Sequence, residues 1–288
     1  MPELPEVEIT ARRLDDGLRD AEVDSALSPG MVALKSFDPP LAALEGRRIS
    51  GVRRIGKMPV IEFAPTDGTG DRIAMLVHMM SAGRLQLFDK RASLRDRTAR
   101  VLVRLTDGRE LRLREFGTKQ RAWAKLMAAG DVEADEMVAT LGPEAWPEPS
   151  VEDLARRIDH PRHLHPMLRD QRVIAGIGRS WVDEVLWEAA LSPFRQGSDL
   201  EEEEVERLHG SLHVLGDAIE HYEDVIGDVV PDKLPMPLRV HRREGEPCPR
   251  CGATLAAVHF AEHVTTYCPE EQTGGRVLKD RRLSRLLK

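Results

Sequence analysis

The pattern of apolar and polar residues predicts a helix followed by many short strands. Val7, Ala11, Leu14 and Leu18 recur at helical spacing, which predicts one amphipathic helix near the start of the chain. Strand-like segments follow, and residues 106–109 are typical of a hairpin turn. Short strands joined by turns, separated along the chain from the helices, indicate a β-sandwich or barrel rather than a βαβ sheet. The segments are 48–55, 59–63, 73–78, 84–88, 100–106, 110–114 and 121–127.

The second half of the chain has a helical pattern. Residues 141–149 contain three prolines and a glycine, so we expect a linker there. Ser150 and Asp153 predict the capped start of a helix. Another helix is expected to end near Gln171, and a glycine-containing apolar loop precedes a helix over 181–190. We therefore predict an α+β multidomain chain with domains at 1–140, 150–240 and 241–288, joined by the linker 141–149.

The three cysteines of the chain, Cys248, Cys251 and Cys268, cluster near the C-terminus. An odd, clustered set indicates a metal site in a reducing compartment rather than a disulfide framework. The spacing C-x-x-C…C-x-x-E is that of a zinc ribbon whose last cysteine is replaced by Glu271, and zinc accepts carboxylate ligands. Three cysteines completed by water, or no metal at all, are the alternatives.

The net charge of −7 argues at first sight against a nucleic-acid partner, but the charge is unevenly distributed. Residues 199–228 contain eleven acidic residues and only Arg207 as a base, whereas residues 239–288 contain ten basic and six acidic residues. An acidic back surface can therefore coexist with a basic working face, although ordinary solvated faces would give the same counts. No apolar run is long enough to span a membrane, and the start of the chain is not a signal peptide, so we expect a cytoplasmic protein.

The first eight residues, MPELPEVE, hold the most suggestive chemistry. Pro2 is small enough for Met1 to be removed, which would leave a secondary amine with a pKa of roughly 7.7–8.0. Such an amine is partly neutral near pH 7 and is therefore nucleophilic; if Met1 is retained, this chemistry is blocked. Pro5 suits the first turn of a helix, so Pro2 and Glu3 would lie just ahead of a rigid helix.

This beginning resembles that of the formamidopyrimidine-DNA glycosylase/endonuclease VIII family of DNA-repair enzymes. The turn Arg114–Gly117, the run 168–179 and the cysteine hairpin resemble further motifs of that family, in the same order. The resemblance implies an N-terminal β-sandwich with an N-terminal helix, a helix–two-turns–helix DNA-binding domain at 150–240, and a zinc-ribbon β-hairpin with a basic tail at 241–288. The resemblance implies that Pro2 is the nucleophile and that Glu3 manages protons at the sugar. It also implies that Glu6 fixes the helix start and that Lys57 contacts the phosphate flanking the lesion.

The resemblance also implies DNA-contacting residues. The histidine-led loop after a buried strand would supply the side chain that fills the hole left by the extruded base, here Met80 or, by a gapless count, Ser81. An arginine would pair with the orphaned base and a phenylalanine would wedge the stack, which offsets part of the unstacking cost. The family has asparagine where this chain has Arg179, often lysine where it has His165, and a finger arginine near His263. The expected DNA-binding residues are His78, Met80, Arg114, Phe116, Lys119, Gly178, Arg179 and His263.

The implied activity is that of a bifunctional DNA glycosylase and abasic-site lyase of base excision repair. We expect a monomer that binds damaged double-stranded DNA near the nucleoid and carries one structural zinc held by Cys248, Cys251, Cys268 and Glu271. The segment 226–242 has three prolines and only Gly227, so it is poorly suited to wrap a base with backbone N–H groups. The oxidised-purine branch of the family has a flexible, glycine-containing loop at this place that folds over the flipped base. The resemblance therefore favours the endonuclease VIII-like branch, with oxidised pyrimidines or ring-opened lesions rather than 8-oxoguanine as substrates. A catalytically impaired damage-binding protein of the same fold is the alternative.

Overall fold

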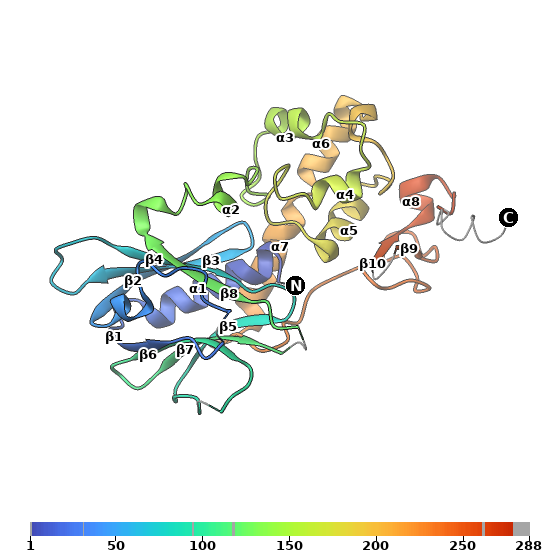
Figure 1. Ribbon diagram of the computed structural model, residues 1–288. Helices are drawn as coiled ribbons and strands as arrows, with labels where there is room; N and C mark the ends of the chain where they lie inside the picture. Colours follow the sequence, from blue (N-terminus) through green and yellow to red (C-terminus); the bar gives the residue numbers. More distant parts are fainter. Residues whose placement is uncertain (1, 31, 94, 117–118, 261–262, 279–288) are drawn as a thin grey trace. The chain divides into compact units, whose positions relative to one another are not determined.

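The computed structural model describes residues 2–30, 32–93, 95–116, 119–260 and 263–278 (Figure 1). The chain forms two compact units. The first contains Met1–Thr140 together with Ile219–Pro235, and the second contains Leu141–Ala218 together with Met236–Lys288. No described helix is long and apolar enough to cross a membrane.

The first unit is a β-sandwich with an N-terminal helix, as the sequence predicts. One sheet has the strand order β1-β6-β7-β5 and the other has the order β2-β3-β4-β8, and all pairings within them are antiparallel. The sequence pattern located every strand of the two sheets except the first. The strands are β1 (Val23–Leu27), β2 (Arg47–Ile55), β3 (Met58–Pro65), β4 (Ile73–His78), β5 (Gly83–Phe88), β6 (Ala99–Leu105), β7 (Glu110–Glu115) and β8 (Trp123–Ala128).

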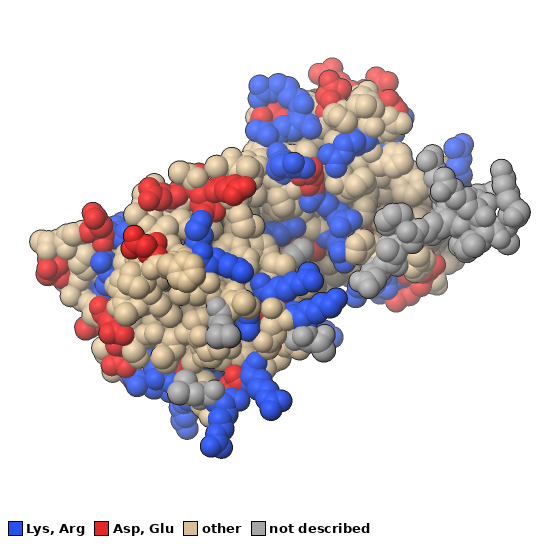
Figure 2. Space-filling view, in the orientation of Figure 1, with Lys and Arg blue, Asp and Glu red and all other residues tan. Residues whose placement is uncertain are grey.

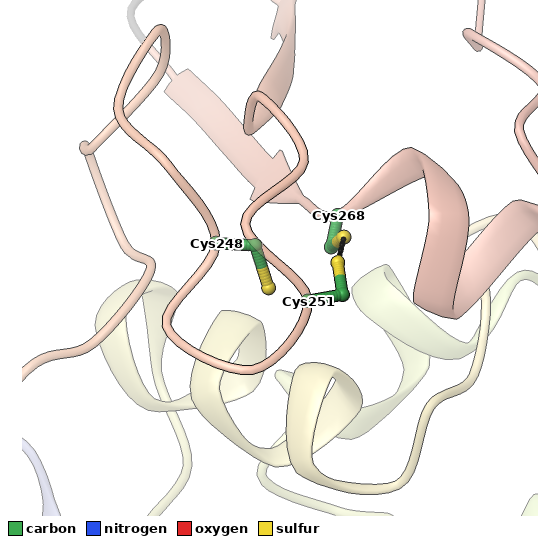
Figure 3. Close-up of side chains that lie close together, drawn as sticks. All are labelled: Cys248, Cys251 and Cys268. Carbon is green, nitrogen blue, oxygen red and sulfur yellow. Dashed lines mark hydrogen bonds between the residues drawn. The ribbon is translucent and has the colours of Figure 1, made fainter.

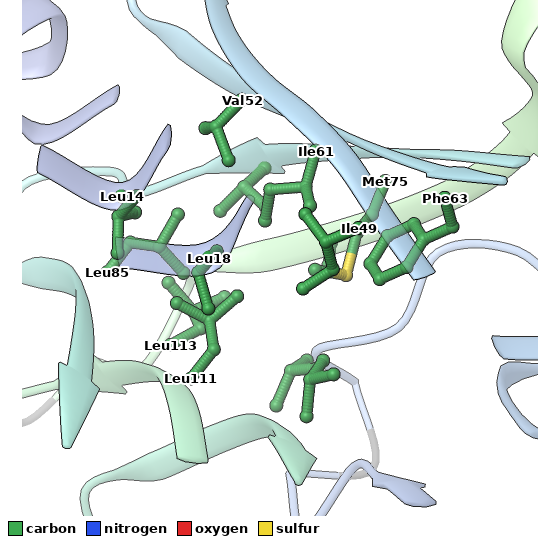
Figure 4. Packing of buried hydrophobic residues seen from close by; sticks show 14 of the residues in the cluster. Leu14, Leu18, Ile49, Val52, Ile61, Phe63, Met75, Leu85, Leu111 and Leu113 are labelled. Carbon is green, nitrogen blue, oxygen red and sulfur yellow. The ribbon is translucent and has the colours of Figure 1, made fainter. Parts of the chain in front are cut away.

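The apolar face of helix α1 (Leu4–Leu18) forms part of the sandwich core. Figure 4 shows Leu14 and Leu18 among side chains from both sheets, including Ile49, Phe63 and Leu111. The predicted helical stripe is therefore confirmed as a core-facing stripe. Burial of one such leucine stabilises the fold by roughly 1.5–3 kcal/mol.

Helix α1 begins at Leu4 because the residues around it suit a helix start. Pro5 lies in the first turn, where its missing N–H costs no hydrogen bond. Glu3 and Glu6 form a reciprocal capping box, in which each side chain accepts a hydrogen bond from the backbone N–H of the other residue. This local arrangement fixes the residues that directly follow Pro2.

The segment 219–235 packs within the first unit. Helix α7 (His213–Val225) spans the boundary between the units in the sequence. Its second half places Tyr222 against Ile9 of α1, and Ile226 and Leu234 complete this small apolar cluster.

The second unit contains the helices and a two-stranded hairpin. Ser150 caps α3 by accepting a hydrogen bond from the backbone of Asp153, as its sequence predicts. The hairpin consists of two antiparallel strands that precede a short helix. The elements are α3 (Val151–Ile158), α4 (Leu164–Leu168), α5 (Arg179–Glu188), α6 (Glu202–Gly210), β9 (Ala256–Phe260), β10 (His263–Tyr267) and α8 (Pro269–Thr273).

The expected linker 141–149 is packed into the second unit. Ala145 is buried and its backbone N–H donates to the carbonyl of Ala175. The ring of Trp146 lies so close to Gly216 that a β-carbon there would come within 2.4 Å of it. The domain limits proposed from the sequence stay predictions. The part of the basic tail that follows residue 278 lies outside the described residues.

Candidate catalytic, DNA-binding and metal-binding residues

The residues next to Pro2 form a buried carboxylate pair. Glu3 and Glu6 are 2 % and 3 % exposed. One carboxylate oxygen of Glu6 accepts a hydrogen bond from the backbone N–H of Glu3 at 2.8 Å, and the other accepts from the hydroxyl of Tyr222 at 2.8 Å. Glu6 therefore joins the helix start to α7, and both acids belong to the helix start that directly follows Pro2 in the chain.

Tyr222 is a site residue that the sequence analysis missed. Burial and the negative charge of Glu6 raise the pKa of Tyr222 well above its usual range, so its hydroxyl stays a hydrogen-bond donor. The chain contains only two tyrosines, and a tyrosine at an apolar position of a helix was the available signal. A buried phenol requires a partner, and here the partner is a candidate catalytic carboxylate.

Lys57 and His78 are neighbours at one end of the sheet β2-β3-β4-β8. Gly56 and Lys57 form the turn between β2 and β3, where Gly56 has a φ of +55°. The His78 ring stacks on Trp123 with a centroid separation of 5.6 Å. Burial and the charge of Lys57 lower the pKa of His78, so it is neutral at pH 7. The structure thus brings a predicted phosphate-contacting lysine next to the predicted DNA-contacting histidine.

The loop after His78 favours Met80 over Met79 as the exposed methionine. Met79 is buried in the sandwich core. Met80 is half-buried, has a φ of +51°, and its backbone N–H donates to Nδ1 of His78 at 3.0 Å. A β-carbon on Gly83 would lie 2.2 Å from the Met79 carbonyl oxygen, so this tight loop requires glycine there. Ser81 is exposed, so the choice between Met80 and Ser81 stays open.

Arg114 and Phe116 lie at the end of β7, the strand that leads into the predicted wedge turn. Phe116 is 46 % exposed, and the Arg114 guanidinium lies 4.6 Å from the centre of its ring. Lys119 is exposed as well, whereas the two residues between Phe116 and Lys119 lie outside the described residues. An exposed aromatic ring is suited to contact another flat apolar surface, such as the face of a base.

Arg114 has an internal partner that the sequence did not suggest. Asp232, from the segment after α7, lies 3.2 Å from Nη1 of Arg114 and also accepts a hydrogen bond from Gln86 at 3.1 Å. Gln86 also donates to the carbonyl of Val230 at 2.8 Å, and Arg84 donates to the carbonyl of Asp232. The proline-rich segment is therefore attached to the outer face of β5 and β7.

Gly178 and Arg179 form the start of helix α5 in the second unit. Gly178 is the buried N-cap, and Arg179 is the exposed first residue of the helix. The preceding loop is shaped by Gln171, whose side chain accepts from the N–H of Gly176 and donates to the carbonyl of Ile177. A helix start with an exposed arginine suits an anion such as a phosphate.

Arg179 and His263 meet although they are far apart in the sequence. Nη2 of Arg179 lies 2.9 Å from Nε2 of His263 on β10, a geometry in which the neutral imidazole accepts from the guanidinium. The first residue of α5 and the first residue of β10 therefore contact one another through their side chains.

His165, which stands where the resemblance led us to expect a lysine, is a buried residue of the second unit. His165 is buried, its Nε2 lies 3.2 Å from the carboxylate of Asp183, and it also contacts the hydroxyl of Thr265. Asp183 accepts in addition from Nδ1 of His241 at 2.7 Å and from the backbone of Thr266. These contacts attach the hairpin to α4 and α5. The sequence reasoning missed Asp183 because a single acid in a helix gives no signal of burial.

Cys248, Cys251 and Cys268 come together as the predicted metal centre (Figure 3). Their sulfur atoms all lie within 4.8 Å of one another. Zinc–sulfur bonds of about 2.3 Å in a tetrahedron place sulfurs somewhat under 4 Å apart, so the three thiols fit three corners of a zinc site. Together with the donor set, this geometry supports a structural zinc.

The surroundings of the thiols favour the thiolate form for Cys248. Burial raises its pKa, but hydrogen bonds from the backbone of Cys251 and Arg250 and from the Trp187 indole together lower the pKa of Cys248 to about 7. The Trp187 nitrogen lies 3.3 Å from the sulfur. Glu271, the predicted fourth ligand, instead has a carboxylate oxygen 3.4 Å from Nη1 of Arg250. Its role as a ligand stays a prediction.

Basic and acidic side chains occupy different areas of each unit (Figure 2). On the visible face of the first unit, lysines and arginines gather around the N-terminus and the nearby ends of the strands, and acidic residues gather around α2 (Glu136–Ala139). In the second unit, basic residues cover α3 and acidic residues cover α6. The negative net charge therefore coexists with basic areas suited to a polyanion.

Three family models match the chain. The formamidopyrimidine-DNA glycosylase N-terminal domain matches residues 1–119, the formamidopyrimidine-DNA glycosylase H2TH domain matches residues 141–229, and the zinc finger found in FPG and IleRS matches residues 245–270. Together they cover the regions that contain the sequence motifs.

Similar proteins carry the same family name. The formamidopyrimidine-DNA glycosylase of Roseiflexus sp. (strain RS-1) is 32 % identical over 288 residues, which cover 94 % of this chain and 100 % of the relative. That of Latilactobacillus sakei is 29 % identical, with 94 % of this chain and 98 % of the relative covered. The solved complex between the Lactococcus lactis Fpg and DNA containing an abasic site has a TM-score of 0.82 at 25 % identity, and 94 % of this chain and 99 % of that chain are covered.

Proposed function

Since the chain belongs to the formamidopyrimidine-DNA glycosylase family and is a DNA glycosylase of base excision repair, we propose that it both excises the damaged base and cleaves the strand at the abasic site, with Pro2 as the nucleophile. The observation that carries this proposal is the buried pair of Glu3 and Glu6 directly beside Pro2, held by Tyr222. A nucleophilic amine next to positioned carboxylates is the arrangement that Schiff-base chemistry requires.

The proposed reaction begins with attack of the Pro2 nitrogen on C1′ of the damaged nucleotide. The glycosidic bond breaks, and the base leaves with the bonding electron pair and takes up a proton. The Pro2 nitrogen gives up its proton, and the C1′–O4′ bond then breaks with O4′ taking up a proton, so the opened sugar is joined to Pro2 as an iminium. This iminium withdraws electrons from C2′, so loss of a C2′ proton expels the 3′ phosphate and cleaves the strand. Water then hydrolyses the iminium and releases Pro2. Glu3 is assigned to the proton transfers at the sugar, because it adjoins Pro2 in the chain.

Glu6 and Lys57 are assigned supporting roles. Glu6 holds the backbone of Glu3 through a 2.8 Å hydrogen bond, which restricts the position of the neighbouring Pro2. Lys57 lies at the β2–β3 turn beside His78, where its charge suits the phosphate that flanks the lesion. His78 orients the loop that carries Met80, the side chain proposed to fill the vacated base position.

Phe116 and Arg114 are assigned to the opened base stack. An exposed phenylalanine can enter the stack, and an arginine can donate to the base left without a partner. Arg114 must then exchange its contact with Asp232 for the base. Lys119, with its exposed ammonium group, is assigned to a backbone phosphate.

Gly178, Arg179 and His263 are assigned to DNA backbone contact in the second unit. The exposed Arg179 at the start of α5 and its partner on β10 support this role. A structural zinc bound by Cys248, Cys251 and Cys268 would fix the hairpin that carries His263, with Glu271 as the proposed fourth ligand. We also assign the protein to the cytoplasm, as a monomer acting at the nucleoid.

Oxidised pyrimidines are the lesions we propose as preferred substrates. The segment 226–242 contains three prolines, and its residues Val230 and Asp232 are attached to β5 and β7. The three prolines fix φ and remove three backbone donors, and the contacts of Val230 and Asp232 hold the segment in place, so we expect it to be poorly suited to wrap a flipped purine with backbone N–H groups. The support for this lesion preference is therefore steric. It concerns the segment 226–242 and not the pocket that would hold the flipped base.

Borohydride trapping tests the proposed mechanism. Incubation of the purified protein with an abasic-site duplex and sodium borohydride should reduce the iminium and leave a covalent protein–DNA adduct on Pro2. Mass spectrometry of the N-terminus in the same preparation establishes whether Met1 has been removed. A trimmed protein that binds the duplex but forms no adduct would refute the chemistry and favour a damage-binding protein.

A panel of duplexes tests the lesion preference. Thymine glycol and 5-hydroxyuracil should be excised faster than 8-oxoguanine opposite cytosine under single-turnover conditions. A formamidopyrimidine and an abasic site complete the panel. Fastest excision of 8-oxoguanine would overturn the preference without affecting the trapping result.

A further inference from the structure

Each end of the β6–β7 strand pair has a buried glutamate on β7 that lies against an arginine of β6. Arg100 and Glu115 lie at the end that leads to Phe116, and Nε of Arg100 is 3.9 Å from the Glu115 carboxylate. Arg104 and Glu110 lie near the other end, next to the β6–β7 hairpin turn, at 3.1 Å. Both glutamates are almost completely buried, at 2 % and 0 % exposure.

The pair of Arg100 and Glu115 joins the two ends of the loop that follows β7. Glu115 is the last residue of the strand, and its carboxylate accepts a hydrogen bond from the backbone N–H of Ala122 at 2.8 Å. Nη1 of Arg100 donates to the side chain of Gln120 at 2.9 Å, and Gln120 donates to the carbonyl of Arg97. One buried guanidinium therefore lies between the residue that enters the loop and the residues that leave it.

Burial of the Arg100 guanidinium costs free energy, so this pair is a poor way to stabilise the fold. Among the described residues, Nε and Nη2 of Arg100 have no hydrogen-bond acceptor, although the side chain is buried. A β-carbon on Gly30 would lie 2.5 Å from Nη1 of Arg100, so the neighbouring backbone leaves room for the guanidinium only because residue 30 is glycine. Apolar residues would fill such a site with equal or greater stability, which points to a role in fixing one conformation.

The loop after β7 begins with Phe116, whose ring is exposed. Its direction follows from the backbone of Glu115, whose N–H donates to the carbonyl of Thr98, and from its own N–H, which donates to the carbonyl of Ala82. We propose that Arg100 and Glu115 are positioning residues that set the direction in which Phe116 leaves β7 and enters the DNA stack. This inference rests on the proposed role of Phe116 in the function above.

The test compares Glu115→Gln with Glu110→Gln. Each change keeps the shape and removes the charge of a buried glutamate on β7 that accepts a backbone N–H. Glu115 lies against Arg100, and Glu110 lies against Arg104 and Arg112. The probe is a duplex with a tetrahydrofuran abasic-site analogue and 2-aminopurine beside it, whose fluorescence rises when a wedge unstacks the base. Glu115→Gln should lose most of that rise and, on a separate duplex that carries an oxidised base, slow single-turnover excision by about 10- to 100-fold, the effect of a displacement near 1 Å. Glu110→Gln should retain both signals.

Arg100→Lys, with Arg104→Lys as its control, provides a second comparison if Glu115→Gln does not fold. Thermal unfolding of all four variants separates lost stability from lost positioning. Equal fluorescence and excision in the Glu115 and Glu110 variants, or a wild-type protein that does not unstack 2-aminopurine, would overturn the inference. Failure of borohydride trapping together with a normal fluorescence difference would reject the proposed chemistry and leave the positioning role supported.

Discussion

The hydrogen bond from Tyr222 to Glu6 allows a quantitative prediction. Tyr222→Phe removes only the hydroxyl oxygen, which donates to the Glu6 carboxylate at 2.8 Å in a site where both residues are buried. Hydrogen bonds to charged groups contribute about 1.5–3 kcal/mol. The variant should therefore lose about that much free energy of unfolding at pH 7.

Loss of this hydrogen bond should also change the pH dependence of activity. The hydroxyl donates to the Glu6 carboxylate, so its removal makes the charged form of this buried group less stable relative to the neutral form. Since one pH unit corresponds to 1.36 kcal/mol, the acid limb of the single-turnover rate should move up by about one to two pH units. Excision rates measured between pH 4.5 and 8 on a saturating lesion duplex provide the assay.

Tyr267→Phe is the matched control, because it changes the only other tyrosine of the chain. Tyr267 is also buried, but its hydroxyl accepts a hydrogen bond from the backbone of Leu278 in the second unit. This variant should lose stability without moving the acid limb. If both variants gave the same pH profile, or if Tyr222→Phe left the profile of the wild type unchanged, the assigned role of Glu6 would be refuted.

Two further predictions concern the second unit. Purified protein should contain about one zinc per chain. In a chelator competition, Glu271→Cys should tighten zinc binding and Glu271→Ala should weaken it. Equal affinities of the two variants and the wild type would show that Glu271 is not a ligand. Arg172 and Arg162 hold the pKa of Asp170 at about 2, so its contribution to stability is present above pH 4 and is lost as the pH falls through 2. Asp170→Asn should cost about 1 kcal/mol at pH 7, since Arg172 is largely exposed, and the difference in urea unfolding should shrink toward pH 2; a difference independent of pH would contradict this.

Much of the fold is predictable because the chain uses strong local signals. The stripe from Val7 to Leu18 and the glycine turn at 106–109 each specify an element without help from distant residues, and both are confirmed. The strand β1 was missed because VDSAL has one fully buried position and no strong alternation. Its place in the sheet follows from pairing with β6, a contact between residues nearly 80 positions apart.

The candidate site was only partly predictable, because motifs identify residues but not their partners. The sequence pointed to Glu6, Arg114 and Cys248, but not to Tyr222 or Asp232, which contact the first two. Trp187, whose indole donates to Cys248, was also missed. Each missed residue acts through a side-chain contact over a long sequence separation, and a single sequence contains no measure of that distance.

The departures from the family pattern are better understood as pairs than as separate losses. Arg179 and His263 stand 84 positions apart, and each taken alone weakens the expectation of a phosphate contact. In the structure Nη2 of Arg179 lies 2.9 Å from Nε2 of His263, so the helix start keeps a cation and the hairpin supplies the acceptor that orients it. His165 likewise lies against Asp183, a buried acid that would be costly without a partner. Each departure therefore has a polar partner within the second unit, and the exposed guanidinium of Arg179 is held in place by the hairpin rather than left unconstrained at the helix start.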